Sequence, residues 1–595
     1  MEGNGNSALI LRLRRSIEGL RQSETHLALA LSLAIGALVG LVTVAFILLT
    51  GRLAARMYPA GDSGWRRILV PALGSLITGY LLWRFFPFAR GSGIPQTKFA
   101  LFINDGRITF RTVLGKFFCC SASLATGIAL GREGPSVHVG AGLASVIARN
   151  AGLSKEQVKS LVPVGCSAAL AAAFNTPIAA VLFSLEEIMG DLHASVLGTA
   201  VLASATSWMV LHLVLGDDPL FHVAGYRLVH PSELAVYAVL GVVGGLGSVA
   251  FVKLLLWLRE LFATFPKWSV WFQPVAGGLT VGLLGYFFPD VMGVGYTYVD
   301  KILNGDVVLK LVVLLAILKI VATAVCYGSG NAGGIFGPSL FIGATMGAAV
   351  GSVAHALFPA YTAGPGAYAL VGMGTAFAGI VRTPLTSVIM IFEVTRDYSI
   401  IVPLMISNLI AYFISQRLQK EPIYEALAYQ DGVHLPTAEA RARAGKGRVS
   451  QAMRPVPLIL SPDTEIGSAV AKMKGGLYDA LPVADQLGLR GMIRRAELEK
   501  AVSGAVSGGA GGTKLADLLE EFHEEHPSAL DFPHVHPDHS LSLALERMGS
   551  SGLKVLPVVS RANIRQLLGV IVLDDILDAY GLAKTPLPAN QEKLS

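Results

Sequence analysis

A single carboxylate, Glu133, lies in the segment Gly131-Arg132-Glu133-Gly134-Pro135, with apolar sequence on both sides. Ionised side chains are unfavourable inside a membrane domain, so a carboxylate there usually marks a path for an ion or a proton. The glycines and the proline interrupt a helix and leave backbone N–H groups without partners. Such groups at a helix start can bind an anion. The segment therefore predicts an anion site with a titratable acid beside it.

The composition predicts the environment of this acid. Hydrophobic residues make up 53% of the 595-residue chain and charged residues 15%, and the mean hydropathy is +0.57. These values are too apolar for a soluble protein of this size and indicate a polytopic membrane protein. The net charge of +6 fits basic cytoplasmic loops and requires no nucleic-acid partner. We expect a basic cytoplasmic helix over residues 1–25 and a transmembrane domain over residues 26–430.

Two motif pairs occur twice in the same order along the transmembrane region. The copies are Gly134-Pro135-Ser136 and Gly337-Pro338-Ser339, and Thr176-Pro177 and Thr383-Pro384, whose threonines each precede a glutamate by ten residues, Glu186 and Glu393. Paired halves with broken helices at equivalent positions are typical of transporters that bind substrate near the membrane midplane. We therefore expect an all-α polytopic domain of two repeated halves, roughly 26–220 and 230–430, related by inversion.

Three Gly-rich segments and one tyrosine motif give this domain a family resemblance. They are Gly91-Ser92-Gly93-Ile94-Pro95, Gly131–Pro135, Gly334-Ile335-Phe336-Gly337-Pro338 and, after the last apolar run, Pro422-Ile423-Tyr424. In this order they resemble the signature segments of the CLC chloride channel and transporter family. The resemblance covers roughly residues 25–430.

The resemblance implies a chloride site. Chloride needs hydrogen-bond donors that do not hold it with a full positive charge, and hydroxyls and helix N-termini supply them. By similarity to the family, the hydroxyls of Ser92 and Tyr424 and the backbone of Ile335 and Phe336 hold the anion. A proline in place of Ser92 goes with nitrate preference in this family, so the serine favours chloride. The same segments do not favour a fluoride-selective relative.

Two glutamates carry the predicted coupling to protons. Glu133 matches the family's gating glutamate, whose carboxylate competes with chloride for the same N–H groups until a proton neutralises it. Glu187 matches the inner proton-transfer glutamate of the exchangers, where channels typically have an apolar residue. The pattern thus favours chloride/proton antiport. A passive gated chloride channel of the same family is the alternative, and an unrelated carrier of an organic anion is a distant one. Glu393 resembles a structural position.

The region after the membrane domain is soluble in composition. We expect a linker over 431–448, a first α/β repeat over 449–502, a Gly-rich connector over 503–513, a second repeat over 514–582 and a tail over 583–595. Both repeats resemble cystathionine-β-synthase (CBS) domains, and a tandem pair can bind adenine nucleotides. Here Arg494 and Val572 replace the usual hydroxyl residues, Glu497 replaces one ribose-binding aspartate, and Asp575 alone is retained. We therefore expect a scaffold rather than a nucleotide site.

The remaining expectations concern assembly and chemistry. The family resemblance implies a homodimer in which each subunit has its own pathway. We expect a prokaryotic inner membrane with both termini in the cytoplasm, no catalytic residues, no metal site and no cofactor. All four cysteines lie in apolar segments, where free cysteine behaves as a small hydrophobic residue.

Overall fold

The computed structural model describes two compact units, Met1–Leu435 and Pro436–Ser595. The described residues are 24–59, 64–192, 195–217, 219–221, 223, 228–433, 447–456, 458–473, 478, 480–486, 488–508, 514–517 and 532–579. The basic helix expected over 1–25 and the tail expected over 583–595 therefore lie outside the described residues, apart from residues 24 and 25.

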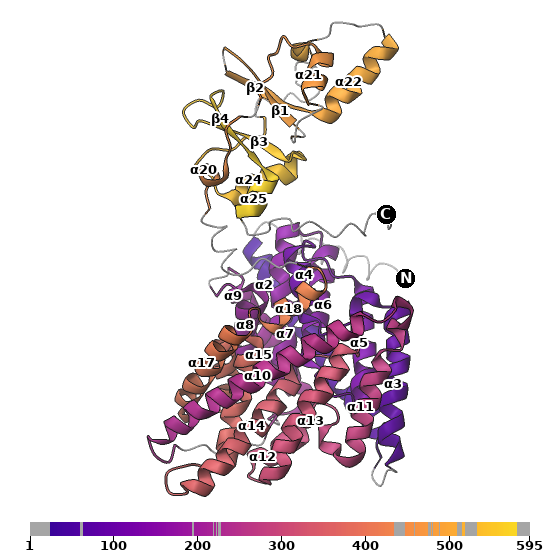
Figure 1. Ribbon diagram of the computed structural model, residues 1–595, viewed down its shortest axis with the longest axis vertical. Coiled ribbons are helices and arrows are strands. Elements are labelled where there is room, and N and C mark those ends of the chain that lie inside the picture. Colours follow the sequence, from indigo (N-terminus) through magenta and orange to yellow (C-terminus); the bar gives the residue numbers. More distant parts are fainter. Residues whose placement is uncertain are drawn as a thin grey trace, which may run out of the picture. The chain divides into compact units, whose positions relative to one another are not determined.

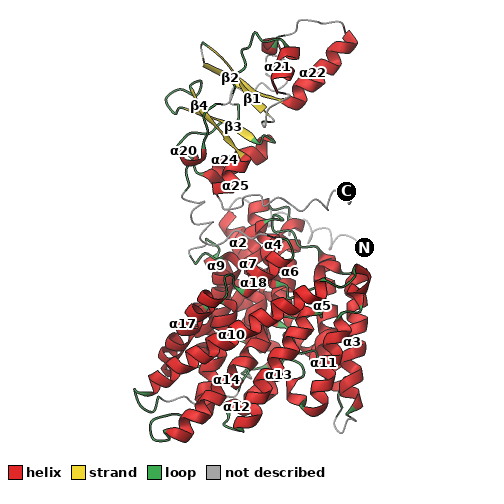
Figure 2. Cartoon of the chain, viewed as in Figure 1, coloured by secondary structure: helices red, strands yellow, loops and turns green. Residues whose placement is uncertain are grey.

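The described secondary-structure elements of the first unit are helices joined by loops (Figure 1, Figure 2). Its first half contains α2 (Glu24–Met57), α3 (Trp65–Arg84), α4 (Ile94–Phe102), α5 (Phe110–Ala125), α6 (Glu133–Asn150), α7 (Lys155–Phe174), α8 (Pro177–Phe183), η2 (Ser184–Met189) and α9 (Leu197–Leu215). Its second half contains α10 (Glu233–Ala263), α11 (Pro274–Phe287), α12 (Tyr296–Leu303), α13 (Leu309–Gly328), α14 (Phe336–Leu357), α15 (Pro365–Val381), α16 (Pro384–Thr395), α17 (Ile401–Leu418) and α18 (Ile423–Gln430). The repeated motifs begin equivalent helices, since Gly-Pro opens α6 and α14 and Thr-Pro opens α8 and α16.

Seven helices among the described residues are long and apolar enough to cross a membrane. They are His26–Met57, Lys155–Phe174, Leu197–Leu215, Glu233–Ala263, Leu309–Gly328, Phe336–Leu357 and the helical span Tyr398–Gln430, which contains α17 and α18. The chain is therefore an integral membrane protein, as its composition predicted.

Glycine contacts hold the innermost helices together. α6 packs on α7, and α14 packs on α15. A Cβ atom on Gly140 would lie 2.4 Å from the carbonyl oxygen of Gly165, and one on Gly343 would lie 2.3 Å from that of Gly372. Since each contact leaves no room for a methyl group, glycine is required at both crossings. The two halves thus use the same close packing at equivalent places.

Reciprocal contacts show how the halves are related. Glu393, near the end of α16, accepts hydrogen bonds from the backbone N–H groups of Ile178 (2.9 Å) and Ala179 (2.6 Å) at the start of α8. Glu186, in the segment after α8, accepts them from Leu385 (3.3 Å) and Thr386 (2.8 Å) at the start of α16. Because an acid at or just after the end of each helix binds the start of the other, the two helices run antiparallel. Two equivalent contacts of this kind are expected when a two-fold axis relates the two halves and inverts one relative to the other.

The second unit contains two antiparallel strand pairs (Figure 2). The pair β1 (Ala480–Asp485) and β2 (Gly488–Arg494) is accompanied by α21 (Ile466–Met473) and α22 (Arg495–Gly508). The pair β3 (Val555–Val559) and β4 (Leu567–Val572) is accompanied by α20 (Val449–Ala452), α24 (Leu541–Ser551) and α25 (Leu573–Ala579). Each Leu-Pro-Val motif lies in the first strand of its pair, as expected for an α/β repeat.

Two features of the structure lie at the expected boundaries. Residues 503–508 of the expected connector belong to α22, because the adjacent Ala505 and Val506 let the helix continue at a cost of about 1 kcal/mol for each glycine. Val449, at the expected start of the first repeat, instead packs in the core of the second repeat with Val535 and Ile571. The segment that begins at Val449 therefore packs on the second repeat before the chain forms the first.

The reciprocal carboxylates predict a stability effect. We expect Glu393→Gln to lower the melting temperature of the detergent-solubilised protein, since a neutral amide is a weaker acceptor for the start of α8. Loss of a helix cap costs about 0.5–2 kcal/mol. Thermal unfolding followed by tryptophan fluorescence measures the change. The matched control is Asp306→Asn, which neutralises an exposed acid in a loop. Equal melting temperatures for the two variants would contradict a capping role for Glu393.

Candidate anion site

Three broken helices start at one place inside the membrane unit. The segments before α6 and α14 pair through Gly131 and Gly334, whose N–O distances are 2.6 and 2.7 Å. A Cβ atom on Gly134 would lie 2.6 Å from the Ser92 hydroxyl oxygen and 3.5 Å from the Cα atom of Gly334. The turn before α4 therefore lies against the start of α6, and the start of α6 lies against that of α14. Gly93 in this turn has a φ of 104°, which favours glycine.

The hydroxyls of Ser92 and Tyr424 lack hydrogen-bond partners. Both residues are fully buried, and neither hydroxyl oxygen is bonded within the described part of the chain. Ser92 lies in the turn before α4, and Tyr424 lies in α18, which packs on α4. Buried polar groups are nearly always hydrogen-bonded, so two neighbouring unbonded hydroxyls mark a place for a ligand. Hydroxyl donors suit an anion.

Ile335 and Phe336 lie where α14 begins, and both are fully buried. The ring of Phe336 packs against three aromatic rings at centroid distances of 4.3 to 5.5 Å, those of Phe377, Phe174 and Phe183. This cluster fixes the first turn of α14, whose backbone N–H groups have no carbonyl partner within the helix. The first turn can therefore donate to a bound anion or to an acid.

The carboxylate of Glu133 occupies this helix start. One oxygen accepts a hydrogen bond from the backbone N–H of Gly337 at 3.2 Å, and the other accepts one from the Tyr296 hydroxyl at 2.5 Å. The side chain is fully buried, and the nearest nitrogen of Arg132 is 4.0 Å away. Glu133 is thus held mainly by an N–H group and a hydroxyl, the donors that would serve an anion. Tyr296 belongs to none of the sequence motifs, and no sequence signal identified it.

Glu187 lies in η2 and forms a buried ion pair. Its Oε1 atom is 2.8 Å from Nζ of Lys98 on α4, and the two side chains are 7% and 4% exposed. The neighbouring Glu186 points to a different place, because its carboxylate caps α16. The adjacent acids therefore separate into a structural one and an ion-paired one. Lys98 was also missed from the sequence, although it follows the Ser92 motif.

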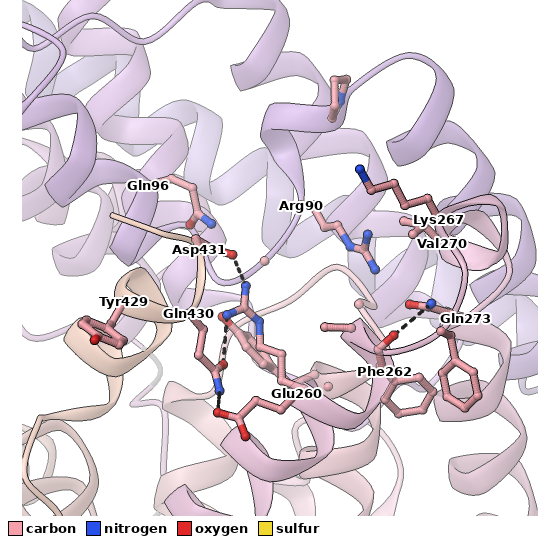
Figure 3. Close-up of a pocket in the computed structure, with 18 of the residues that line it drawn as sticks. Arg90, Gln96, Glu260, Phe262, Lys267, Val270, Gln273, Tyr429, Gln430 and Asp431 are labelled. Atoms are coloured by element: carbon pink, nitrogen blue, oxygen red, sulfur yellow. Dashed lines mark hydrogen bonds and ion pairs between the residues drawn. The ribbon is translucent and has the colours of Figure 1, made fainter. Parts of the chain in front are cut away.

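A cavity of about 710 Å³ adjoins the Ser92 turn (Figure 3). Gly91 and Tyr327 line it, and the Tyr327 hydroxyl accepts a hydrogen bond from the backbone of Ser92 at 3.3 Å. The other lining residues include three cationic ones, Arg90, Arg259 and Lys267, and two acids, Glu260 and Asp431. Since Arg259 pairs with Asp431, an excess of positive charge remains beside the turn. The four predicted side chains Ser92, Glu133, Glu187 and Tyr424 are not among its lining residues.

Two acids of the second unit form ion pairs with arginine side chains. One oxygen of Asp575 binds Arg454, and its other oxygen is buried without a hydrogen bond among the described residues. Glu497 accepts a hydrogen bond from the Arg494 side chain at 2.6 Å. A nucleotide ribose at Asp575 would therefore have to compete with Arg454 for that carboxylate.

Comparison with known proteins identifies relatives of both units. The family model described as "Voltage gated chloride channel" matches residues 74–416, and the CBS domain model matches residues 449–504 and 515–581. The H(+)/Cl(-) exchange transporter ClcA of Vibrio campbellii is 32% identical over 61% of this chain and 79% of its own length. ClcA of Vibrio cholerae serotype O1 is 32% identical over 68% of this chain and 89% of its own length.

Solved structures show the same architecture. The crystal structure of a slow cyanobacterial Cl-/H+ antiporter has a TM-score of 0.63 and 25% identity, and covers 68% of this chain and 97% of its own. The crystal structure of a eukaryotic CLC transporter has the same TM-score with 21% identity, and covers 92% of this chain and 97% of its own. The latter likeness concerns the fold alone. The predicted helical membrane domain with a C-terminal CBS pair is confirmed.

Tyr296 is expected to control how readily the Glu133 carboxylate leaves the start of α14. In Tyr296→Phe the carboxylate loses its shortest hydrogen bond, and a bond to a charged group contributes about 1.5–3 kcal/mol. Chloride should then displace the acid more easily, with roughly tenfold tighter apparent binding by isothermal titration calorimetry. Tyr298→Phe, which removes the hydroxyl of another buried tyrosine in the same helix, is the control. Unchanged affinity in Tyr296→Phe would show that the Tyr296 hydroxyl does not restrain the carboxylate.

Proposed function

The chain belongs to the voltage-gated chloride channel family, and from this we propose that it exchanges chloride for protons across a membrane. Its relatives are transporters, and it is not an enzyme. The carboxylate of Glu133, bound at a helix start where an anion would bind, is the observation that carries the proposal. Relatives named as H(+)/Cl(-) exchange transporters, at 32% identity, support it.

We propose that chloride binds at the hydroxyls of Ser92 and Tyr424 and at the backbone N–H groups of Ile335 and Phe336. The two buried hydroxyls lack partners, and the first turn of α14 has donors available. None of these donors carries a full charge, so chloride is dehydrated without being trapped. The positive excess in the adjoining cavity would draw anions toward the Ser92 turn.

Glu133 couples the two ions by competition. While it is ionised, its carboxylate occupies the N–H group of Gly337 and excludes chloride from that position. A proton removes the negative charge and weakens this bond, so chloride can enter as the neutral side chain leaves. The carboxylate and chloride cannot fill the same position together. Each time the protonated side chain leaves this position it carries a proton in one direction, and chloride moves in the other.

Glu187 is the proposed source of protons from the inner side. It is buried beside Lys98, away from the capping role of Glu186, and its charge is close enough to influence Tyr424. The charge of the acid can therefore influence the anion site. The competing function is a passive chloride channel, in which Glu133 gates and Glu187 takes no part.

The remaining features are proposals of the same kind. We expect a homodimer with one pathway in each subunit, in a prokaryotic inner membrane with both termini in the cytoplasm. The CBS pair would serve as a scaffold without a nucleotide, which the arginine contacts of Asp575 and Glu497 support. No cofactor besides the transported ions is required.

A flux experiment distinguishes exchange from passive conduction. Purified protein in liposomes, with a chloride gradient, a clamped voltage and a pH probe, should move protons uphill as chloride flows down its gradient. Glu133→Gln should keep chloride flux and abolish proton movement, because a permanently neutral side chain can neither compete nor carry a proton. Protein-free liposomes are the control. Chloride flux without proton movement in the unmodified protein would establish a channel, and uphill proton movement in Glu133→Gln would remove Glu133 from the coupling.

A further inference from the structure

Glu187 is one of three charged side chains that meet between two short helices. The ammonium of Lys98 lies 2.8 Å from Oε1 of Glu187 and 3.6 Å from Oε1 of Glu425. Lys98 is on α4 and Glu425 is on α18, and α4 packs against both α18 and η2. We call Lys98, Glu187 and Glu425 the inner triad.

The charges of the inner triad do not balance. One ammonium stands against two carboxylates, so the group carries one excess negative charge when all three are ionised. Buried charge is unfavourable unless it is compensated, and within the triad Lys98 can fully compensate only one carboxylate. Of the other charged groups nearby, Glu186 adds negative charge near Glu187, and the guanidinium of Arg382 adds positive charge near Glu425. One proton bound to the triad therefore removes the excess charge.

The two carboxylates differ in their access to solvent. The side chain of Glu425 is 23% exposed, whereas that of Glu187 is 7% exposed and that of Lys98 is 4% exposed. Glu187 is thus shielded from water, whereas the Glu425 side chain is accessible to water. A proton from solution meets the more exposed carboxylate first.

We propose that Glu425 is the entry acid that delivers protons to Glu187, with Lys98 as the cation that both acids share. This rests on the proposed role of Glu187 in exchange. Protonated Glu425 gives its proton to the Glu187 carboxylate and becomes a carboxylate itself. Lys98 remains an ammonium throughout, and its ion pair shifts from Glu187 to Glu425. The total charge of the triad is unchanged by the transfer.

The inner triad is joined to the anion site through its two helices. Glu425 follows Tyr424 directly, and Lys98 lies in the helix that begins at the Ser92 turn. A proton arriving at the triad therefore changes the charge beside both hydroxyls of the anion site. This placement lets proton loading and chloride occupancy influence each other.

Glu425→Gln tests the proposal in the full-length protein in liposomes. We expect proton and chloride fluxes to fall together by several-fold with their ratio unchanged, because entry of the proton becomes limiting while Glu187 still carries it. Glu425→Asp should restore much of the rate. Imidazole buffer, a small diffusible proton carrier, should rescue Glu425→Gln, which a purely structural role would not allow. The matched control is Glu421→Gln, which neutralises a glutamate in the loop just before α18.

The outcomes separate this proposal from the function it rests on. If Glu425→Gln matches Glu421→Gln, or if imidazole restores nothing, Glu425 is not the entry acid. Glu187→Gln reports on the underlying function, since it should abolish proton movement and leave chloride flux. If Glu187→Gln still moves protons uphill, the assignment of Glu187 fails, whatever Glu425 does.

Discussion

The fold depends on how helix starts buried in the membrane unit satisfy their backbone N–H groups. Water is absent there, so each unpaired N–H group needs a partner from the protein or from a bound ion. At α8 and α16 the partners are Glu393 and Glu186, each from the opposite half. At α14 the partner is Glu133, the first residue of α6, whose start lies against that of α14. The same interaction thus serves as a cap at α8 and α16 and, in the function we propose, as an exchangeable contact at α14.

The difference between the two uses lies in the number and source of the donors. Glu393 binds two successive backbone N–H groups, and Glu186 binds two together with the hydroxyl of Thr386. Glu133 binds one backbone N–H group at 3.2 Å and a tyrosine hydroxyl. Fewer backbone donors and a side-chain donor that can rotate make the Glu133 carboxylate easier to replace. Close glycine packing of α6 on α7 and of α14 on α15 keeps the surrounding backbone fixed while a side chain moves.

The sequence predicted the parts of the site that lie within continuous motifs. Glu133 and the helix breaks could be recognised because Gly and Pro interrupt an apolar run, and the two halves because their motifs recur. Tyr296, Lys98 and Glu425 could not, since each acts on an acid far away along the chain, and a lone tyrosine or lysine in a short helix has no local signature. The different contacts of Glu186 and Glu187 could not be predicted for the same reason, because the partner of Glu186 lies in the other half. The packing of Val449 in the core of the second repeat could not be predicted either, because its neighbours there lie far along the chain.

The reciprocal caps of α8 and α16 bear on how a protein of two inverted halves can arise. Each half supplies the acid that the other half needs, and the two contacts are equivalent. A chain containing one half could therefore have satisfied its own Thr-Pro helix start by pairing with a second copy inserted in the opposite orientation. Gene duplication and fusion would then have preserved contacts that already existed between separate molecules. The divergence of the two copies, with the acid Glu133 in one half and Phe336 at the equivalent position in the other, would have followed once they were joined.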